Sequence, residues 1–383
     1  MTGNWSLHRL SGSLGGFAAQ WDSLNASAFG SHPLLDSRFV DALLRHFSRG
    51  REWLAIYLTA GRPTAMCIVT PRRAGVWQTF LPSQAQIAPA LLNEATLAQS
   101  LIAKLPGYIG VLDLLCQDPD YTAPPPGTWL HASVKRHALT ISIPLHGSFE
   151  TYWSTRPKKL VSNLRRYERR ASSEFSDVQF RLITSAAEMQ EAVARYGALE
   201  SSGWKGAQGT ALSPDNEQGR FYAGLMERYA QSGSAAVFEL WFGQTLVASR
   251  LLIQGGKTVV FLKTTYAEPY ARLAPGRLLL KHVIEQMFCT YAGQTLEFYT
   301  DADHELQSWA TDSRVISHIS LYRNRLAALA HSALQLVRRP YGTRDVAERS
   351  PTDQATSSDF MSLDSVQEAL TDEAPRRKER SSS

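Results

Sequence analysis

Cysteine is scarce in this sequence, and long apolar runs are absent from it. Its 383 residues include three cysteines, Cys67, Cys116 and Cys289, too few and too widely spaced for a disulfide framework or a CxxC metal site. No stretch has the roughly 18 consecutive apolar residues of a membrane span, and residues 1–17 lack the apolar core of a plain signal peptide. These absences predict a protein of the reducing cytoplasm, neither exported nor integral to a membrane.

Excess charge is modest. Lys and Arg number 40 and Asp and Glu 35, which gives a net charge of +5. Residues 341–383 hold nine acidic and six basic side chains, so the preceding 340 residues, with 34 basic and 26 acidic ones, carry a surplus of eight positive charges. Such a surplus can steer an anionic ligand, but it lacks the dense basic stripe of a dedicated nucleic-acid binder. We expect small anions or an anionic membrane surface as partners, no DNA, and a cytoplasmic location that allows peripheral contact with the inner membrane.

Several catalytic motifs are also missing. The sequence has no HxH, HExxH or CxxC spacing, no Walker A string and no Rossmann GxGxxG string. None of the three cysteines has a visible His or Asp partner for nucleophilic catalysis. We therefore predict no metal site and no covalent intermediate.

The chain divides into three parts by pattern. Its length predicts two or three domains. Residues 1–145 alternate strand-like and helical runs, among them a helical run from Ala95 (ATLAQSLIAKL), and predict one α/β unit with a mixed sheet. A second unit follows over 146–340, and its last element is expected to be a helix that ends at about Val337. Residues 341–383 are rich in Ser, Thr, Asp, Glu and Arg, which predicts a disordered tail.

The second unit contains the clearest pattern. The runs AVFELWF, TLVASRLLIQ and KTVVFLKTTY, separated by Gly243-Gln244 and Gly255-Gly256, predict three antiparallel strands with two tight turns. A strongly apolar helix is expected to start at Gly276. Upstream, a helix is expected over about 157–171, and Ser185-Ala-Ala-Glu188 has the spacing of a capping box that would begin a helix.

Four segments carry a family resemblance. FETYWSTRPKKLVSNLRRYERR (149–170), LESSGWKGAQGTAL (199–212), YAEPYARLAPGRLLL (266–280) and EFYTDADHELQSW (297–309) resemble the GNAT-type proteins of cellulose and exopolysaccharide biosynthesis, the CelD/BcsL family. The resemblance covers roughly residues 1–340. It implies an α+β fold (an α/β sandwich) of two tandem GNAT-like domains with mixed sheets, an N-terminal one over 1–145 and an acyltransferase domain over 146–340. It also implies acetyl-CoA or another acyl-CoA as co-substrate, and a sugar or cell-envelope precursor as acceptor.

The predicted donor site is the start of the apolar helix. A glycine there lets the backbone approach a pyrophosphate, and the unpaired amides of the first turn, from Gly276 through Arg277 and Leu278 to Leu279, can bind it. Arg277 adds a positive charge. The wider GNAT pattern is Arg or Gln, any two residues, Gly, any one residue, and then Gly or Ala. When the pattern ends at Gly276, this sequence has Ala271 at the first position and Ala274 at the fourth, so only one glycine remains.

Two other segments are candidates for substrate binding. The Gly-rich stretch 202–210 places Trp204 and Lys205 between two helices, where they can stack on a sugar or adenine and hold a phosphate. A turn pinned by a buried Trp explains the same pattern equally well. The helix over 157–171 is strongly basic. Within its Asn-Leu-Arg-Arg sequence we single out Arg165 and Arg166 as candidate phosphate ligands. The alternative interpretation is an ordinary solvated helix surface.

GNAT chemistry requires a base for the attacking hydroxyl or amine and an acid for the leaving thiolate. The resemblance implies His304 as the base, oriented by Asp303 or Glu297. Tyr266, at the predicted strand end before the glycine, is the candidate acid; the alternative for it is an aromatic packing role.

Three functions remain open at this stage. The first is acyl transfer from acyl-CoA. The second is a FemAB-like transfer from aminoacyl-tRNA, which the eroded glycine motif and the basic helix favour. The third is a non-catalytic GNAT-like protein that assembles or binds at the cell envelope.

Overall fold

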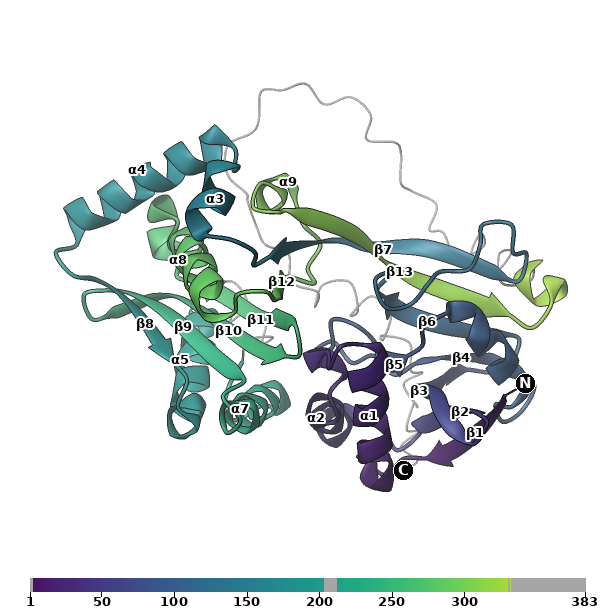
Figure 1. The fold of residues 1–383 in the computed structure, drawn as a ribbon. Coiled ribbons are helices and arrows are strands. Elements are labelled where there is room, and N and C mark those ends of the chain that lie inside the picture. Colours follow the sequence, from purple (N-terminus) through teal and green to yellow (C-terminus); the bar gives the residue numbers. More distant parts are fainter. Residues whose placement is uncertain (1–2, 203–211, 330, 332–383) are drawn as a thin grey trace, which may run out of the picture.

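The chain folds around one continuous mixed sheet (Figure 1). The computed structural model describes residues 3–202, 212–329 and 331. Within this part, thirteen strands run in the order β1-β2-β3-β4-β6-β13-β7-β12-β11-β10-β9-β8, with β5 beside β3. Their bounds are β1 Asn4–Arg9, β2 Trp53–Thr59, β3 Arg62–Arg73, β4 Val76–Thr79, β5 Ala90–Leu91, β6 Val111–Gln117, β7 Ala132–Pro144, β8 Val178–Ile183, β9 Ala235–Phe242, β10 Thr245–Gly255, β11 Thr258–Tyr266, β12 Thr295–Glu297 and β13 Asp312–Tyr322.

Helices cover both faces of the sheet. At the β8–β11 end, α4 and α8 lie on one face and α5 and α7 on the other, as Figure 1 shows. No helix in the described ranges combines the length and the apolar character needed to cross a membrane. The bounds are α1 Ala18–Ala28, α2 Ser37–Phe47, α3 Phe149–Ser154, α4 Lys158–Glu174, α5 Met189–Ser201, α7 Glu217–Ala230, α8 Pro275–Thr290 and α9 His304–Gln307, with short 3₁₀ helices η2 Pro33–Leu35, η3 Ala95–Ala103, η4 Ala186–Glu188 and η5 Glu268–Leu273.

The predicted three-stranded meander is β9, β10 and β11, and its two turns lie at the predicted glycines. The apolar helix after it is α8, whose inward face is fully buried. The predicted helix near residue 95 is instead the 3₁₀ helix η3. The predicted capping box does not form, because the Ser185 side chain caps no amide and η4 precedes α5. The last helix expected before residue 340 and the tail over 341–383 fall largely or wholly outside the described residues.

The sheet has two halves, one containing β1–β6 and the other β8–β12, and strands from distant parts of the sequence join them. β13 lies between β6 and β7 and pairs antiparallel with both. The end of β7, in turn, pairs with β12 over Ser142–Pro144. The sheet therefore runs without a break across the boundary expected near residue 145, and strands from each side of that boundary complete the other side.

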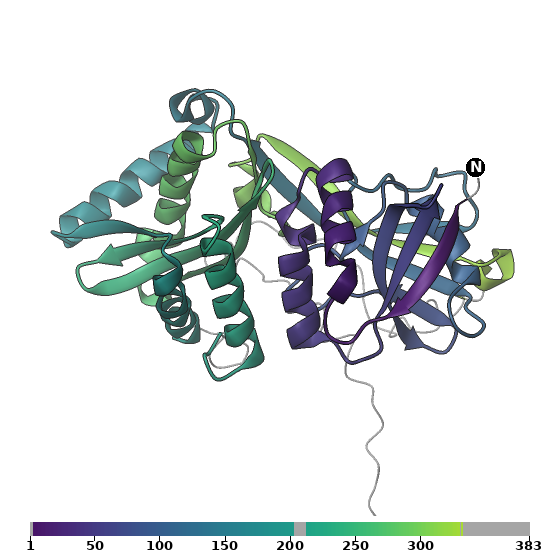
Figure 2. The same cartoon turned by 60° about the horizontal axis from the view of Figure 1, so that its bottom comes forward.

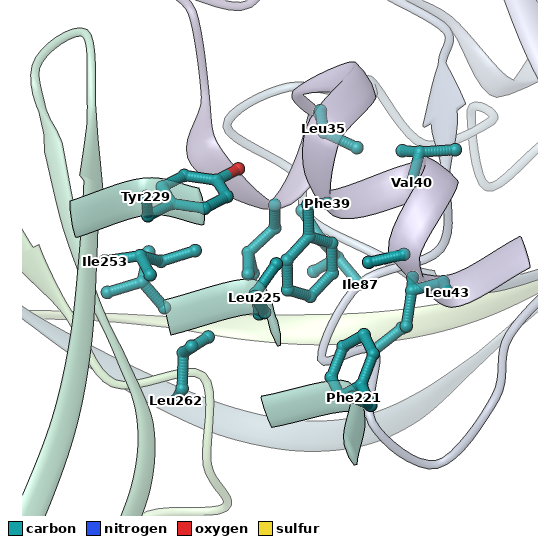
Figure 3. Close-up of a cluster of buried hydrophobic side chains, with 14 of the residues drawn as sticks. Leu35, Phe39, Val40, Leu43, Ile87, Phe221, Leu225, Tyr229, Ile253 and Leu262 are labelled. Atoms are coloured by element: carbon teal, nitrogen blue, oxygen red, sulfur yellow. The ribbon is translucent and has the colours of Figure 1, made fainter. Parts of the chain in front are cut away.

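An apolar interface also connects the halves (Figure 3). There α2 packs against α7, and Phe39 of α2 and Phe221 of α7 are both 0% exposed, with ring centroids 6.1 Å apart. Figure 2 shows the two helices side by side between the halves. The Tyr229 hydroxyl donates a hydrogen bond to the Pro33 carbonyl oxygen at 2.9 Å. Burying a large apolar side chain contributes roughly 1.5–3 kcal/mol, so this contact helps to fix the two halves relative to each other.

Candidate active site

The sheet opens between β11 and β12. These parallel strands pair over only three residues, Thr258–Val260 against Thr295–Glu297. Beyond that point β11 continues to Tyr266 with β10 on one side, and among the described residues no strand pairs with it on the other. We call residues 262–266 and the end of β12 the strand gap. Since η5 and α8 follow β11 directly, the strand gap leads to the N-terminus of α8 (Figure 1).

Helix α8 begins without a side-chain cap. Its N-cap residue, Ala274, has a left-handed φ of 51°, and its carbonyl oxygen accepts from the amides of Arg277 at 3.0 Å and Leu278 at 3.1 Å. Pro275 has no amide hydrogen. Between residues 274 and 278, only the Gly276 amide therefore has no hydrogen-bond partner in the described part of the chain. The sequence predicted a cradle of several amides at this helix start; this turn offers one.

The other residues predicted to hold the donor contact the protein itself. Leu278 and Leu279 are core side chains, 4% and 0% exposed. Arg277 forms an ion pair with Glu305 of α9, and its Nη1 lies 3.3 Å from the Tyr167 hydroxyl oxygen of α4. Arg277 therefore ties α8 to two neighbouring helices, and a phosphate that binds it must share it with a carboxylate.

Two side chains, Tyr266 and Arg250, contact Gly276. A Cβ added at Gly276 would lie 3.5 Å from the Tyr266 ring, so Tyr266 packs directly against the helix start. The buried Arg250 of β10 donates from Nη2 to the Gly276 carbonyl oxygen at 3.3 Å, and burial lowers the Arg250 pKa to about 10. Sequence reasoning missed Arg250, although one arginine inside the apolar run TLVASRLLIQ was a visible signal.

Glu297 stands where β11 and β12 part, and it is 4% exposed. Arg314 of β13 places Nη2 at 2.9 Å from Glu297 Oε2, an ion pair that is not aligned as a hydrogen bond. Burial raises the pKa of Glu297 to about 7, although the Arg314 charge acts in the opposite direction. A carboxylate with that pKa can accept a proton at neutral pH, as a general base must.

A chain of hydrogen bonds fixes Arg314 beside Glu297. Arg314 binds Asp118 through two contacts, Nε to Oδ1 at 2.7 Å and Nη2 to Oδ2 at 2.6 Å. The Tyr299 hydroxyl donates to Asp118 Oδ2 at 2.9 Å. His32 accepts the Leu34 amide at Nδ1, so its Nε2 carries the proton and donates to the Tyr299 oxygen at 3.0 Å. Residues from both halves thus build one buried network.

The predicted His304 base lies elsewhere. His304 is exposed at the first turn of α9, and Asp303 caps that helix by accepting the Leu306 amide at 2.7 Å. Within the described ranges, no hydrogen bond or ion pair joins His304 to Asp303 or Glu297. The expected orientation of His304 by one of these carboxylates is therefore not present, because local capping uses Asp303 and the Arg314 network holds Glu297.

The predicted substrate residues are only partly described. Trp204 and Lys205 lie outside the described residues. Arg165 and Arg166 are exposed on α4, and Arg166 Nη2 donates to Asn163 Oδ1 at 3.1 Å. Neither arginine contacts the network around Glu297 in the described structure.

Comparison with known proteins identifies the fold and the domain. Residues 158–304 match the family model of the acetyltransferase (GNAT) domain. No curated protein shows significant sequence similarity to the chain.

Solved structures resemble most of the chain. A crystal structure of FemX is 9% identical, with a TM-score of 0.51 over 85% of this chain and 99% of that one. A protein of unknown function from Bacteroides thetaiotaomicron is 8% identical, with a TM-score of 0.51 over 83% and 100%. A tandem GNAT protein from the clavulanic acid pathway is 13% identical, with a TM-score of 0.43 over 84% and 99%. The family model and the two structures with TM-scores of 0.51 together show a GNAT-like fold, in which residues 158–304 match the GNAT acetyltransferase domain.

Proposed function

We propose that the protein transfers an acyl group, acetyl in the first instance, from acyl-CoA to a hydroxyl or amine of a sugar or cell-envelope precursor. The observation that carries this proposal is the position of Glu297. A buried carboxyl with a raised pKa lies at the point where β11 and β12 part, and the same opening leads to the Gly276 amide. The resemblance to exopolysaccharide-synthesis proteins supports the acceptor class.

The donor would bind along the strand gap with its pyrophosphate at the start of α8. Gly276 suits this role because its amide has no partner in the described structure and it carries no side chain. Arg277 adds a charge at the same turn, shared with Glu305. One amide and one shared arginine form a small cradle, which fits a donor held mainly along the strand gap.

Glu297 replaces His304 as the proposed base. Its carboxylate takes the proton from the acceptor O–H or N–H as that atom attacks the thioester carbonyl carbon, and the C–S bond then breaks. Glu297 then returns that proton to the leaving thiolate. Tyr266, the acid expected from the sequence, lies against Gly276 and six residues along β11 from Val260, the partner of Glu297. At about 3.3 Å per residue it lies roughly 20 Å from that carboxyl, beside the proposed pyrophosphate position. His32, Tyr299, Asp118 and Arg314 act as positioning residues, since they reach the reaction only through Glu297.

Helix α4 would hold anionic parts of a substrate. Tyr167 of α4 contacts Arg277, so the loop before α8 lies along that side of the helix. Three basic residues of α4 are spaced by seven and four residues and therefore share one face of the helix, next to the side that bears Tyr167: Lys159, Arg166 and Arg170. We call these three residues the α4 stripe. Arg165, two residues from Tyr167, projects from the opposite side and stays solvated.

Donor binding is tested by calorimetric titration with acetyl-CoA and a longer acyl-CoA. Wild-type protein is expected to bind, and Gly276→Asp is expected to weaken binding at least about a hundredfold, because two like charges brought together at an interface cost several kcal/mol. The added Cβ meets the Tyr266 ring at an ordinary contact distance, so the variant should fold.

The matched control is Gly224→Asp, which adds the same charge on the exposed surface of α7 where a Cβ meets nothing within 4 Å. It should bind like wild type. Failure of the folded wild type to bind any acyl-CoA would remove acyl-CoA as the donor.

A second donor, aminoacyl-tRNA, is favoured by one observation. Six exposed cations of α4 have no acidic partner among the described residues, far more charge than the diphosphate of CoA needs. They are Lys158, Lys159, Arg165, Arg166, Arg169 and Arg170.

Replacing the three residues of the α4 stripe by Gln separates the two donors. If tRNA is the donor, the variant binds tRNA more weakly and the slope of log affinity against log salt falls by about two to three units, since each lost phosphate contact removes up to 0.9. The control replaces Arg51, Arg62 and Lys104, exposed in the other half, and should leave the slope unchanged. Fluorescence anisotropy over a salt series measures both. No tRNA binding in any variant excludes this donor.

A further inference from the structure

Two β-bulges lie at the same level on the two sides of β13. Opposite β6, Ser317 pairs with Gln117 and Ile319 with Leu114, so two residues of β6, Leu115 and Cys116, face the single residue His318. Opposite β7, Ile316 pairs with Ala138 and Ser317 with Arg136, which leaves His137 as the extra residue on β7. Bulges re-aim side chains, and these two bring residues of three strands together.

The side chains so gathered are Cys116, His137 and His318. One potential ligand atom from each lies within 4.8 Å of the others, and the two imidazole centroids are 4.5 Å apart. Cys116 is 3% exposed, and both histidines are partly buried. Thiolate and imidazole together are the ligand set of zinc and related transition metals.

The lone pairs of the two rings are differently engaged. The Cys116 amide donates to His318 Nδ1 at 3.0 Å, so the ring proton of His318 is on Nε2, and an ion that binds Nδ1 must displace this hydrogen bond. His137 Nε2 is buried and has no hydrogen-bond partner in the described structure. Burial also keeps both rings neutral, lowering the His318 pKa to about 4 and the His137 pKa below its usual value.

The backbone at Cys116 is unusual as well. Its φ is 43°, a left-handed value that is strained for a residue with a Cβ. Strained positions of this kind persist where the surroundings impose them and are enriched at functional sites. Here the strain places the thiol and the amide of one residue next to the same imidazole.

We propose that Cys116, His137 and His318 bind one zinc-class transition-metal ion through Sγ, Nε2 and Nδ1. This inference is independent of the proposed acyl transfer. Zinc binds sulfur at about 2.3 Å and nitrogen at about 2.0–2.1 Å, so the three atoms must draw together by about 1 Å when the ion enters. The fourth position remains for water or another small ligand.

Binding is coupled to loss of one proton. Burial raises the pKa of the Cys116 thiol to about 12, so the thiolate forms only as the ion binds: thiol and M²⁺ give the metal thiolate and one H⁺. Lys135 and Arg72 place positive charge near His318, and Asp301 places negative charge near His137. Charge alone therefore does not attract the ion, and coordination must hold it.

The test is a titration of chelator-treated full-length protein with Co²⁺ under a non-thiol reductant. We expect one equivalent to bind with visible ligand-field bands, a near-ultraviolet thiolate-to-cobalt band, and displacement of cobalt by Zn²⁺. Calorimetry in two buffers of different ionisation enthalpy should report one proton released per ion.

Variants locate the site. Cys116→Ser is expected to abolish the thiolate band, and His137→Gln to weaken binding by more than the roughly tenfold to hundredfold typical of losing an outer-shell partner. Cys67→Ser, a buried cysteine elsewhere, and Cys289→Ser, an exposed one, should retain the band. Absence of a thiolate band in the wild type, or its loss in the Cys289→Ser variant alone, would overturn the proposal whatever the ligand variants do.

Discussion

Replacing Glu297 by Gln is expected to lower the rate of acyl transfer by roughly two to four orders of magnitude, the usual contribution of a positioned general base. The amide keeps the size of the side chain but cannot take a proton. Because Glu297 is 4% exposed and already lies beside Arg314, no solvent carboxylate can replace it. The measurement is the release of CoA thiol from acetyl-CoA in the presence of an amine or hydroxyl acceptor.

The pH dependence gives the same prediction a second readout. Burial raises the pKa of Glu297 to about 7, so the active carboxylate is largely protonated at pH 6 and largely free at pH 8. Wild-type activity should therefore rise with pH through about 7 and then level off. The residual activity of Glu297→Gln should lack this rise.

His304→Ala is the matched control. Its side chain is exposed on α9 and has no partner in the described structure, so removing it should change the rate less than about twofold, as expected for a surface position. A large loss in this variant together with an active Glu297→Gln would restore His304 as the base and refute the assignment to Glu297.

The second large effect concerns stability. Arg314→Met is expected to destabilise the protein by about 3–5 kcal/mol, the range for removing one partner of a buried ion pair. The side chain of Asp118 is only 2% exposed, and the substitution removes both of its contacts with the Arg314 guanidinium. It also removes the ion pair between Arg314 and the buried Glu297. Chemical denaturation at pH 8 measures the loss.

Two companions make this result specific. Arg136→Met removes the corresponding charge from an ion pair with Asp301 in which both side chains are more than 60% exposed, and it should cost less than about 1 kcal/mol. Adding Asp118→Asn to Arg314→Met should recover part of the loss, because the buried charge is then gone. Equal losses in Arg314→Met and Arg136→Met would mean that the buried network contributes no more than a surface pair.

Local patterns of the sequence predict local structure here. The meander β9–β11 and the inward face of α8 follow from periodicity and turn residues, and both are present. The prediction near residue 95 was wrong in type, since η3 is a 3₁₀ helix. Ser185 has the spacing of a capping box, but the turn of η4 precedes the α-helix and its hydroxyl reaches no amide.

The candidate site is less accessible to such reasoning, because its members are far apart in sequence. Glu297 could be proposed from its place after a strand, whereas Asp118 and Arg314 are 196 residues apart and His32 and Tyr299 are 267 apart. No periodicity links such pairs. A charged residue within or beside a buried apolar strand is the signal that would have suggested Arg314 and Asp118.

The placement of β13 between β6 and β7 imposes an order on synthesis. The ribosome completes β7 long before it delivers Asp312–Tyr322, and at about 5–20 residues per second the interval is on the order of ten seconds or more. During that interval the nascent chain holds two strands whose shared neighbour does not yet exist, and open strand edges invite pairing with other chains. Faster translation between the two strands should therefore raise the yield of native protein, and chaperone demand should fall sharply once Tyr322 has left the exit tunnel.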